Sequence, residues 1–102
     1  MEKDKYITEV IFRVDTIDTV FALFPYEIET FNGHVNFYQH VGQHSSADYD
    51  YCIKNSRLAT KEEALDLKTE LESIGYNLKV IKRRTFKKYS KSYRKFYGEK
   101  YM

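Results

Sequence analysis

Residues 60–76 read TKEEALDLKTELESIGY, and this stretch decides the fold. Thr60 and Glu63 form a capping box, in which each side chain accepts from a main-chain N–H of the other residue. The apolar residues recur at the spacing of one helical face: Ala64, Leu67, Leu71 and Ile74. Gly75 then supplies the left-handed residue that commonly follows a helix. The stretch therefore predicts one well-delimited helix.

Segments with the composition of strands lie on both sides of this helix. Their β-branched and aromatic residues predict strands at 10–14, 20–24, 34–41 and 78–82, with a shorter strand at 51–53. Pro25 is expected to end the second strand, because proline cannot donate to a central ladder. The order of elements, β-β-β-α-β, predicts an α+β fold with a small, mostly antiparallel sheet and one central helix.

Length and composition narrow the class of protein. A chain of 102 residues has room for a single domain. It has one cysteine, Cys52, which excludes an intramolecular disulfide and is expected to be a buried, unreactive residue. The longest apolar run, residues 20–24, is far shorter than the roughly 20 residues of a membrane span. A cytoplasmic protein with no membrane contact is expected.

Charge divides the chain in two. Residues 1–81 carry 8 Lys and Arg against 14 Asp and Glu, a net charge of −6, whereas residues 82–102 carry 9 against one, a net charge of +8. We therefore distinguish an α+β domain at 1–84 from a basic, aromatic segment at 85–102. The aromatic residues of this segment are spaced like a helical stripe, which predicts a docked amphipathic helix; a mobile tail is the alternative.

The basic segment suggests a nucleic-acid contact. Lysine and arginine bind phosphates, and aromatic rings stack on bases. The candidate contact residues are Arg83, Arg84, Lys87, Lys88, Tyr89, Lys91, Tyr93, Arg94, Lys95 and Tyr97. Two other interpretations stay open: a solvated helix whose rings complete the core, and attraction to an acidic protein surface.

A polar loop is expected at residues 42–50, and it forms a second candidate site with the end of the preceding strand. Its candidate ligand or interface residues are His40, Gln43, His44, Ser45 and Asp48. Histidine and carboxylate side chains suit a general acid–base pair or a metal site. They equally suit hydrogen bonds that fix the loop backbone. We expect no metal and no cofactor.

The run YQHVGQHSSAD, residues 38–48, resembles a loop found in a group of short proteins from bacterial genomes, prophages and other mobile elements. The resemblance covers about residues 9–84 and includes ATKEE at 59–63 and LESIGYNL at 71–78. No activity is established for this group, so the resemblance implies a genomic setting and no catalytic residues. The basic C-terminal segment is not part of the shared pattern.

These observations favour a non-enzymatic nucleic-acid-binding accessory protein of a phage or mobile element, with weak sequence preference. One alternative is a protein-binding inhibitor or accessory that acts on a host defence protein. Another is a small hydrolase that uses His40, His44 and Asp48. An exposed strand edge or the tyrosine stripe would also allow a homodimer.

Overall fold

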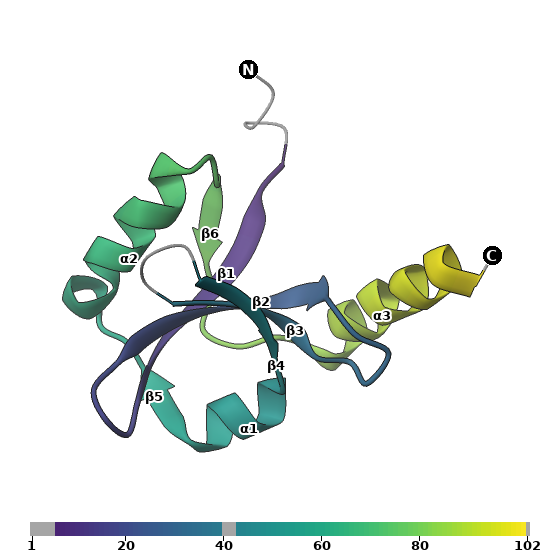
Figure 1. Cartoon of the computed structure of the whole chain (residues 1–102), viewed down its shortest axis with the longest axis horizontal. Helices are drawn as coiled ribbons and strands as arrows, with labels where there is room; N and C mark the ends of the chain where they lie inside the picture. The colour runs from purple at the N-terminus through teal and green to yellow at the C-terminus, as the bar shows by residue number, and fades with distance from the viewer. Residues whose placement is uncertain (1–5, 40–42, 102) are drawn as a thin grey trace.

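The computed structural model describes residues 6–39 and 43–101, and this part of the chain contains six strands and three helices (Figure 1). In chain order they are β1 (Thr8–Asp15), β2 (Val20–Ile28), β3 (Val35–Gln39), β4 (Gln43–Ala47), α1 (Tyr49–Lys54), β5 (Ser56–Leu58), α2 (Lys61–Ser73), β6 (Leu78–Val80) and α3 (Phe86–Tyr101). The α+β class and the mostly antiparallel sheet predicted from the sequence are confirmed.

The sheet has the order β4-β3-β2-β1-β5, and each of these neighbours pairs antiparallel. β6 joins β1 in parallel, with Val10 opposite Val80. The carbonyl oxygens of Val10 and Phe12 accept from the N–H groups of Ile81 and Ala59, respectively. Because residues two apart in a strand direct their main-chain groups to the same side, β5 and β6 share one edge of β1.

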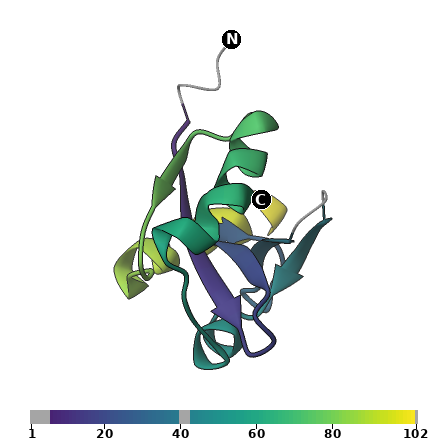
Figure 2. The same cartoon turned by 90° about the vertical axis from the view of Figure 1, so that its left-hand side faces the viewer.

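Helices cover both faces of the sheet. α2 packs on one face over a cluster that includes Val10, Phe12 and Phe24, while α1 and α3 pack on the other face over Ile11 and Leu23. Figure 2 shows α2 in front of the sheet, with β6 at the edge beside it. Burial on both faces explains why residues 20–24 form a continuous apolar run instead of an alternating one.

The predicted end of the second strand at Pro25 is wrong. β2 continues to Ile28, and Pro25 is fully buried within it. The register between β2 and β3 shifts between Phe24 and Ile28. Proline is tolerated at such an irregularity because no regular ladder bond is required of it.

The predictions of a polar loop at residues 42–50 and a strand at 51–53 are also wrong for the described residues. The expected loop forms β4 and then the cap of α1, and the expected strand at 51–53 is helical. The Asp48 carboxylate accepts from the N–H groups of Asp50 and Tyr51, which starts the helix. Residues 40–42, including the end of the third predicted strand, lie outside the described residues.

The helix predicted from the capping box is confirmed as α2. Thr60 and Glu63 exchange both bonds of the box, and Gly75 has a φ of +114° just beyond the helix end. The C-terminal segment, for which a helix and a mobile tail were both open, forms helix α3.

Candidate functional site

α3 has two chemically different faces. One face carries the rings of Tyr89, Tyr93 and Phe96, which pack against the apolar cluster beneath α1 and α3. The Tyr89 hydroxyl donates to the carbonyl oxygen of Gly33 at 3.0 Å, and the Tyr93 hydroxyl donates to that of Phe31 at 2.7 Å. These bonds attach the helix to the turn between β2 and β3, so the face is a docking face.

Two cations near the start of α3 are engaged within the domain. The Arg84 guanidinium lies between the rings of Tyr49 and Tyr89, with its carbon 3.9 and 3.8 Å from the two ring centroids. Lys88 forms an ion pair with Glu9 of β1. Both side chains therefore anchor the helix, and each would have to leave a partner to bind a phosphate.

The opposite face of α3 is basic and exposed. Lys87, Lys91 and Arg94 follow one another at i, i+4 and i+7, which places them on one stripe, with Lys95 beside it. No ion pair joins any of these four, or the exposed Arg83 before the helix, to a residue that the structure describes. Five cations are thus free to meet an external anion.

The charge of the surrounding segment also favours an anion on this face of α3. Residues 82–98 contain no Asp or Glu, whereas the preceding 81 residues have a net charge of −6. Figure 1 shows α3 extending away from the sheet toward the C-terminus. The basic face therefore stands apart from most of the acidic domain, which would repel a polyanion.

The tyrosines proposed to stack on bases lie mainly on the docking face. Tyr89 and Tyr93 are half-buried, and their hydroxyls bond to the β2–β3 turn. Tyr97 is 47% exposed, and its ring lies 5.8 Å from that of Phe31, centroid to centroid, in an edge-on contact. Tyr89 and Tyr93 therefore attach α3 to the domain. Tyr97 is the only one of these three tyrosines with substantial exposed ring surface.

His44 lies in a separate polar and aromatic cluster on the α2 face of the sheet. Its Nδ1 is 3.1 Å from Asn36 Oδ1, and Asn36 Nδ2 donates to Glu27 Oε1 at 3.0 Å. The ring of Tyr38 lies 4.6 Å from that of His44. Because the amide oxygen of Asn36 accepts, Nδ1 of the neutral imidazole carries the proton and Nε2 is left as an acceptor.

The structure separates the other members of the predicted loop site. Asp48 caps α1, and it is not a partner of His44. Ser45 lies on β4 opposite Phe37, and Gln43 is the first residue of β4. His40 lies outside the described residues. Nowhere in residues 6–39 and 43–101 do three or more His, Cys, Asp or Glu side chains gather to hold a metal ion.

Comparison with family models, with curated proteins and with solved structures finds no match to this chain. The resemblance of the 38–48 loop to phage and mobile-element proteins therefore stays a prediction. None of the helices in the described part of the chain is long and apolar enough to cross a membrane.

Proposed function

We propose that this protein binds nucleic acid through the basic face of α3, with little preference for sequence. One observation carries the proposal: Lys87, Lys91 and Arg94 form a single exposed stripe on the side of α3 opposite its docked rings, and they have no ionic partner among the residues that the structure describes. A fixed cationic stripe on a rigid element is suited to a polyanion, because no charge has to be released from an ion pair first.

The length of the stripe suits a phosphate backbone. From Lys87 to Arg94 the helix rises by about 10 Å at 1.5 Å per residue. One DNA strand carries a phosphate about every 3.4 Å along its axis, so the stripe matches about three phosphates. Arg83 and Lys95 flank it and would extend the contact to about five. Contacts to phosphates carry no sequence information, which accounts for the weak preference.

The docked tyrosines have a supporting role in this proposal. Tyr89 and Tyr93 hold α3 against the domain, so that the cations are presented on a fixed helix. Preorganisation of this kind lowers the conformational entropy lost on binding. Stacking of Tyr89 and Tyr93 on bases is no part of this mechanism.

The test is the salt dependence of duplex DNA binding, measured by fluorescence anisotropy. Five phosphate contacts predict a slope of log K against log salt of about −4.5. Replacing Lys87, Lys91 and Arg94 with glutamine should reduce the slope to about −2. The matched control replaces Lys54, Lys61 and Lys68, which removes the same charge from other elements and should leave the slope near that of the unmodified protein.

Two results would contradict the proposal. One is the absence of binding at low salt. The other is an equal loss of binding in the test and control variants, which would show that net charge alone governs the interaction. Circular dichroism of each variant should show the same helix content as the unmodified protein.

A further inference from the structure

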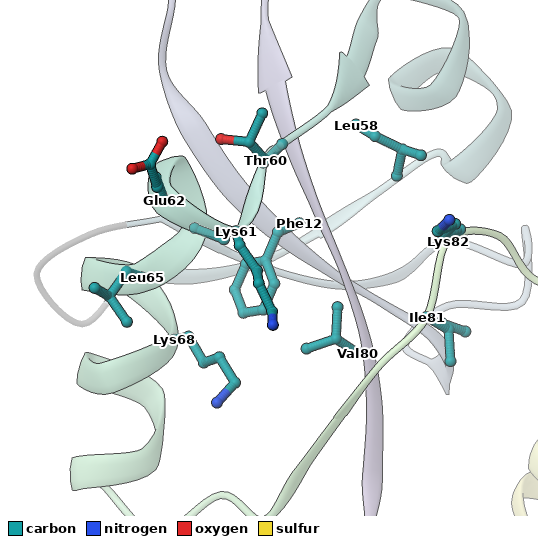
Figure 3. A pocket seen from close by; sticks show the side chains of 12 residues that line it. Phe12, Leu58, Thr60, Lys61, Glu62, Leu65, Lys68, Val80, Ile81 and Lys82 are labelled. Carbon is teal, nitrogen blue, oxygen red and sulfur yellow. The ribbon is translucent and has the colours of Figure 1, made fainter.

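A second surface of the molecule has the properties of a binding site, and it lies away from the basic face of α3. An apolar groove of about 520 Å³ runs between α2 and β6 (Figure 3). Phe12 and Ala64, both buried, are part of its lining. Leu58 and Val80 also line it, and Val80 is 52% exposed to solvent although its side chain is apolar. Exposed apolar side chains gathered around one concave site are typical of an interaction surface.

The groove is bordered by a strand edge without a strand partner. Among the described strands, β6 pairs with β1 alone. The N–H of Ile81 donates to Val10, so the main-chain groups of residues 79 and 81 face β1. Those of Leu78 and Val80 consequently face outward. An edge of this kind is a template for one more strand.

The rim of the groove is positively charged. Lys61 and Lys68 extend from α2 across its mouth in Figure 3, and Lys82 follows β6 at the other wall. Glu62 also lines the groove, with its carboxylate directed away from Phe12 in the same view, and Lys68 forms an ion pair with Glu72 at 3.0 Å. Lys61 and Lys82 have no ionic partner within the described residues.

We propose that this groove binds an extended segment of a partner protein, in which apolar residues alternate with acidic ones, by adding it as a strand to β6. Main-chain bonds to Leu78 and Val80 would supply affinity, and alternate side chains would supply specificity. Apolar side chains of the segment would cover Phe12 and Val80, and its carboxylates would meet Lys61 and Lys82.

Two other occupants suit the groove less well. A second copy of the chain would add its own β6, whose sequence Leu78-Lys79-Val80 continues into Lys82, and would bring cations toward the lysine rim. A small anionic amphiphile would satisfy the apolar floor and the rim but would leave the outward main-chain groups of β6 without a partner.

The experiment is an NMR titration of the ¹⁵N-labelled full chain with three synthetic seven-residue peptides. The first alternates valine and glutamate, the second alternates valine and lysine, and the third is the first peptide with a central proline. The expected result is that only the first peptide shifts the amide signals of Leu58, Leu65 and Val80. The proline weakens binding because it removes a main-chain donor.

Variants identify the surface that binds. Val80→Asp should weaken binding of the valine–glutamate peptide by about tenfold or more, because it places a carboxylate in the apolar wall. The double substitution Lys61→Glu and Lys82→Glu should reverse the preference, so that the valine–lysine peptide binds better. Lys79→Glu, on the opposite face of β6, is the matched control and should change the affinity less than threefold.

Three outcomes would overturn the proposal. The first is the absence of shifts at Leu58, Leu65 and Val80 with the valine–glutamate peptide at millimolar concentration. The second is equal binding of both charged peptides. The third is that sodium dodecanoate shifts these signals while no peptide does, which would assign the groove to an amphiphile.

Discussion

Tyr49 contacts Arg84 in two ways. Its ring lies 3.9 Å from the guanidinium carbon, and its hydroxyl accepts from the Arg84 main-chain N–H at 3.0 Å. Tyr49 is the first residue of α1, and Arg84 lies 35 residues later, just before α3, so one side chain joins α1 to the segment that leads into α3. The second ring over Arg84, that of Tyr89, comes from α3 itself.

We expect Arg84→Lys to destabilise the domain although it keeps the charge. Lysine has no flat group to fill the space between two rings, and the loss should be about 1–2 kcal/mol in urea unfolding. Hydrogen exchange should increase in α3. Arg83→Lys is the control, since Arg83 is exposed, and it should change stability by less than about 0.5 kcal/mol. Equal effects of the two substitutions would exclude the ring sandwich as an anchor.

The turn between β2 and β3 yields a second prediction, because Gly33 lies directly beneath Tyr89. Gly33 has a φ of +85°, and a methyl group added to it would collide with the Tyr89 hydroxyl. Gly75 has a φ of +114° with open space around it. Gly75→Ala should therefore cost about 1 kcal/mol of backbone strain, and Gly33→Ala about 2–3 kcal/mol in chemical denaturation.

A double-mutant cycle separates the two terms at Gly33. In a Tyr89→Phe background the colliding oxygen is gone, and the next ring carbon lies 3.7 Å from the added methyl position. The cost of Gly33→Ala should then fall to that of Gly75→Ala. A cost that stays unchanged would mean that strain alone explains the effect.

The cap of α2 predicts how stability depends on pH. The side-chain hydrogen bond from Arg57 and the main-chain N–H of Thr60 lower the pKa of Glu63 from 4.5 to about 2. A carboxylate with a lowered pKa in the folded state stabilises the protein above the pKa of the unfolded chain. Its contribution is lost as the pH falls from about 5 to about 2.

In the Glu63→Gln variant, the melting temperature should therefore fall less than in the unmodified protein when the pH is lowered from 5 to 2. Glutamine can still accept from the Thr60 N–H, so the helix start is preserved at neutral pH. Glu62→Gln is the control, because Glu62 is exposed and has no hydrogen-bond partner in the described part of the chain. An equal flattening by both variants would contradict the assigned role of Glu63.

The sequence predicted an element correctly where the element depends on the type and spacing of its side chains. The capping box located α2, and the period of the rings predicted α3. β4 was missed because His44, Ser45 and Ser46 are exposed on an edge strand that is held by main-chain bonds to β3. Such bonds leave no apolar alternation in the sequence.

The sequence indicated the basic face of α3 in part, but it did not indicate the groove between α2 and β6. The charge excess of residues 82–102 indicated the basic segment, and the period of its rings indicated which side of it would dock. The sequence could not show which cations are engaged, because this depends on tertiary contacts. Arg84 stacks on the ring of Tyr49, and Lys88 forms an ion pair with Glu9. The groove between α2 and β6 had no sequence signal, since Phe12, Leu58 and Val80 come from three separate segments.

Cys52, the only cysteine of the chain, lies in an environment that disfavours its reactive thiolate form. Burial raises the pKa of its thiol, and the nearby Asp48 carboxylate raises it further, while Arg13 acts in the opposite direction. Because the thiolate is the reactive form, alkylation by iodoacetamide at pH 7.5 should be slower than that of a free cysteine peptide. This environment argues against Cys52 as a nucleophile.

The contribution of Asp48 can be tested without loss of its cap. Asn is as good an N-cap as Asp, so Asp48→Asn keeps α1 while it removes the charge. The variant should alkylate faster than the unmodified protein at pH 7.5, because the thiolate is then less disfavoured. Asp50→Asn, in the first turn of α1, is the matched control and should leave the rate unchanged. If the control accelerates alkylation equally, the general charge of α1, and not Asp48, governs the thiol.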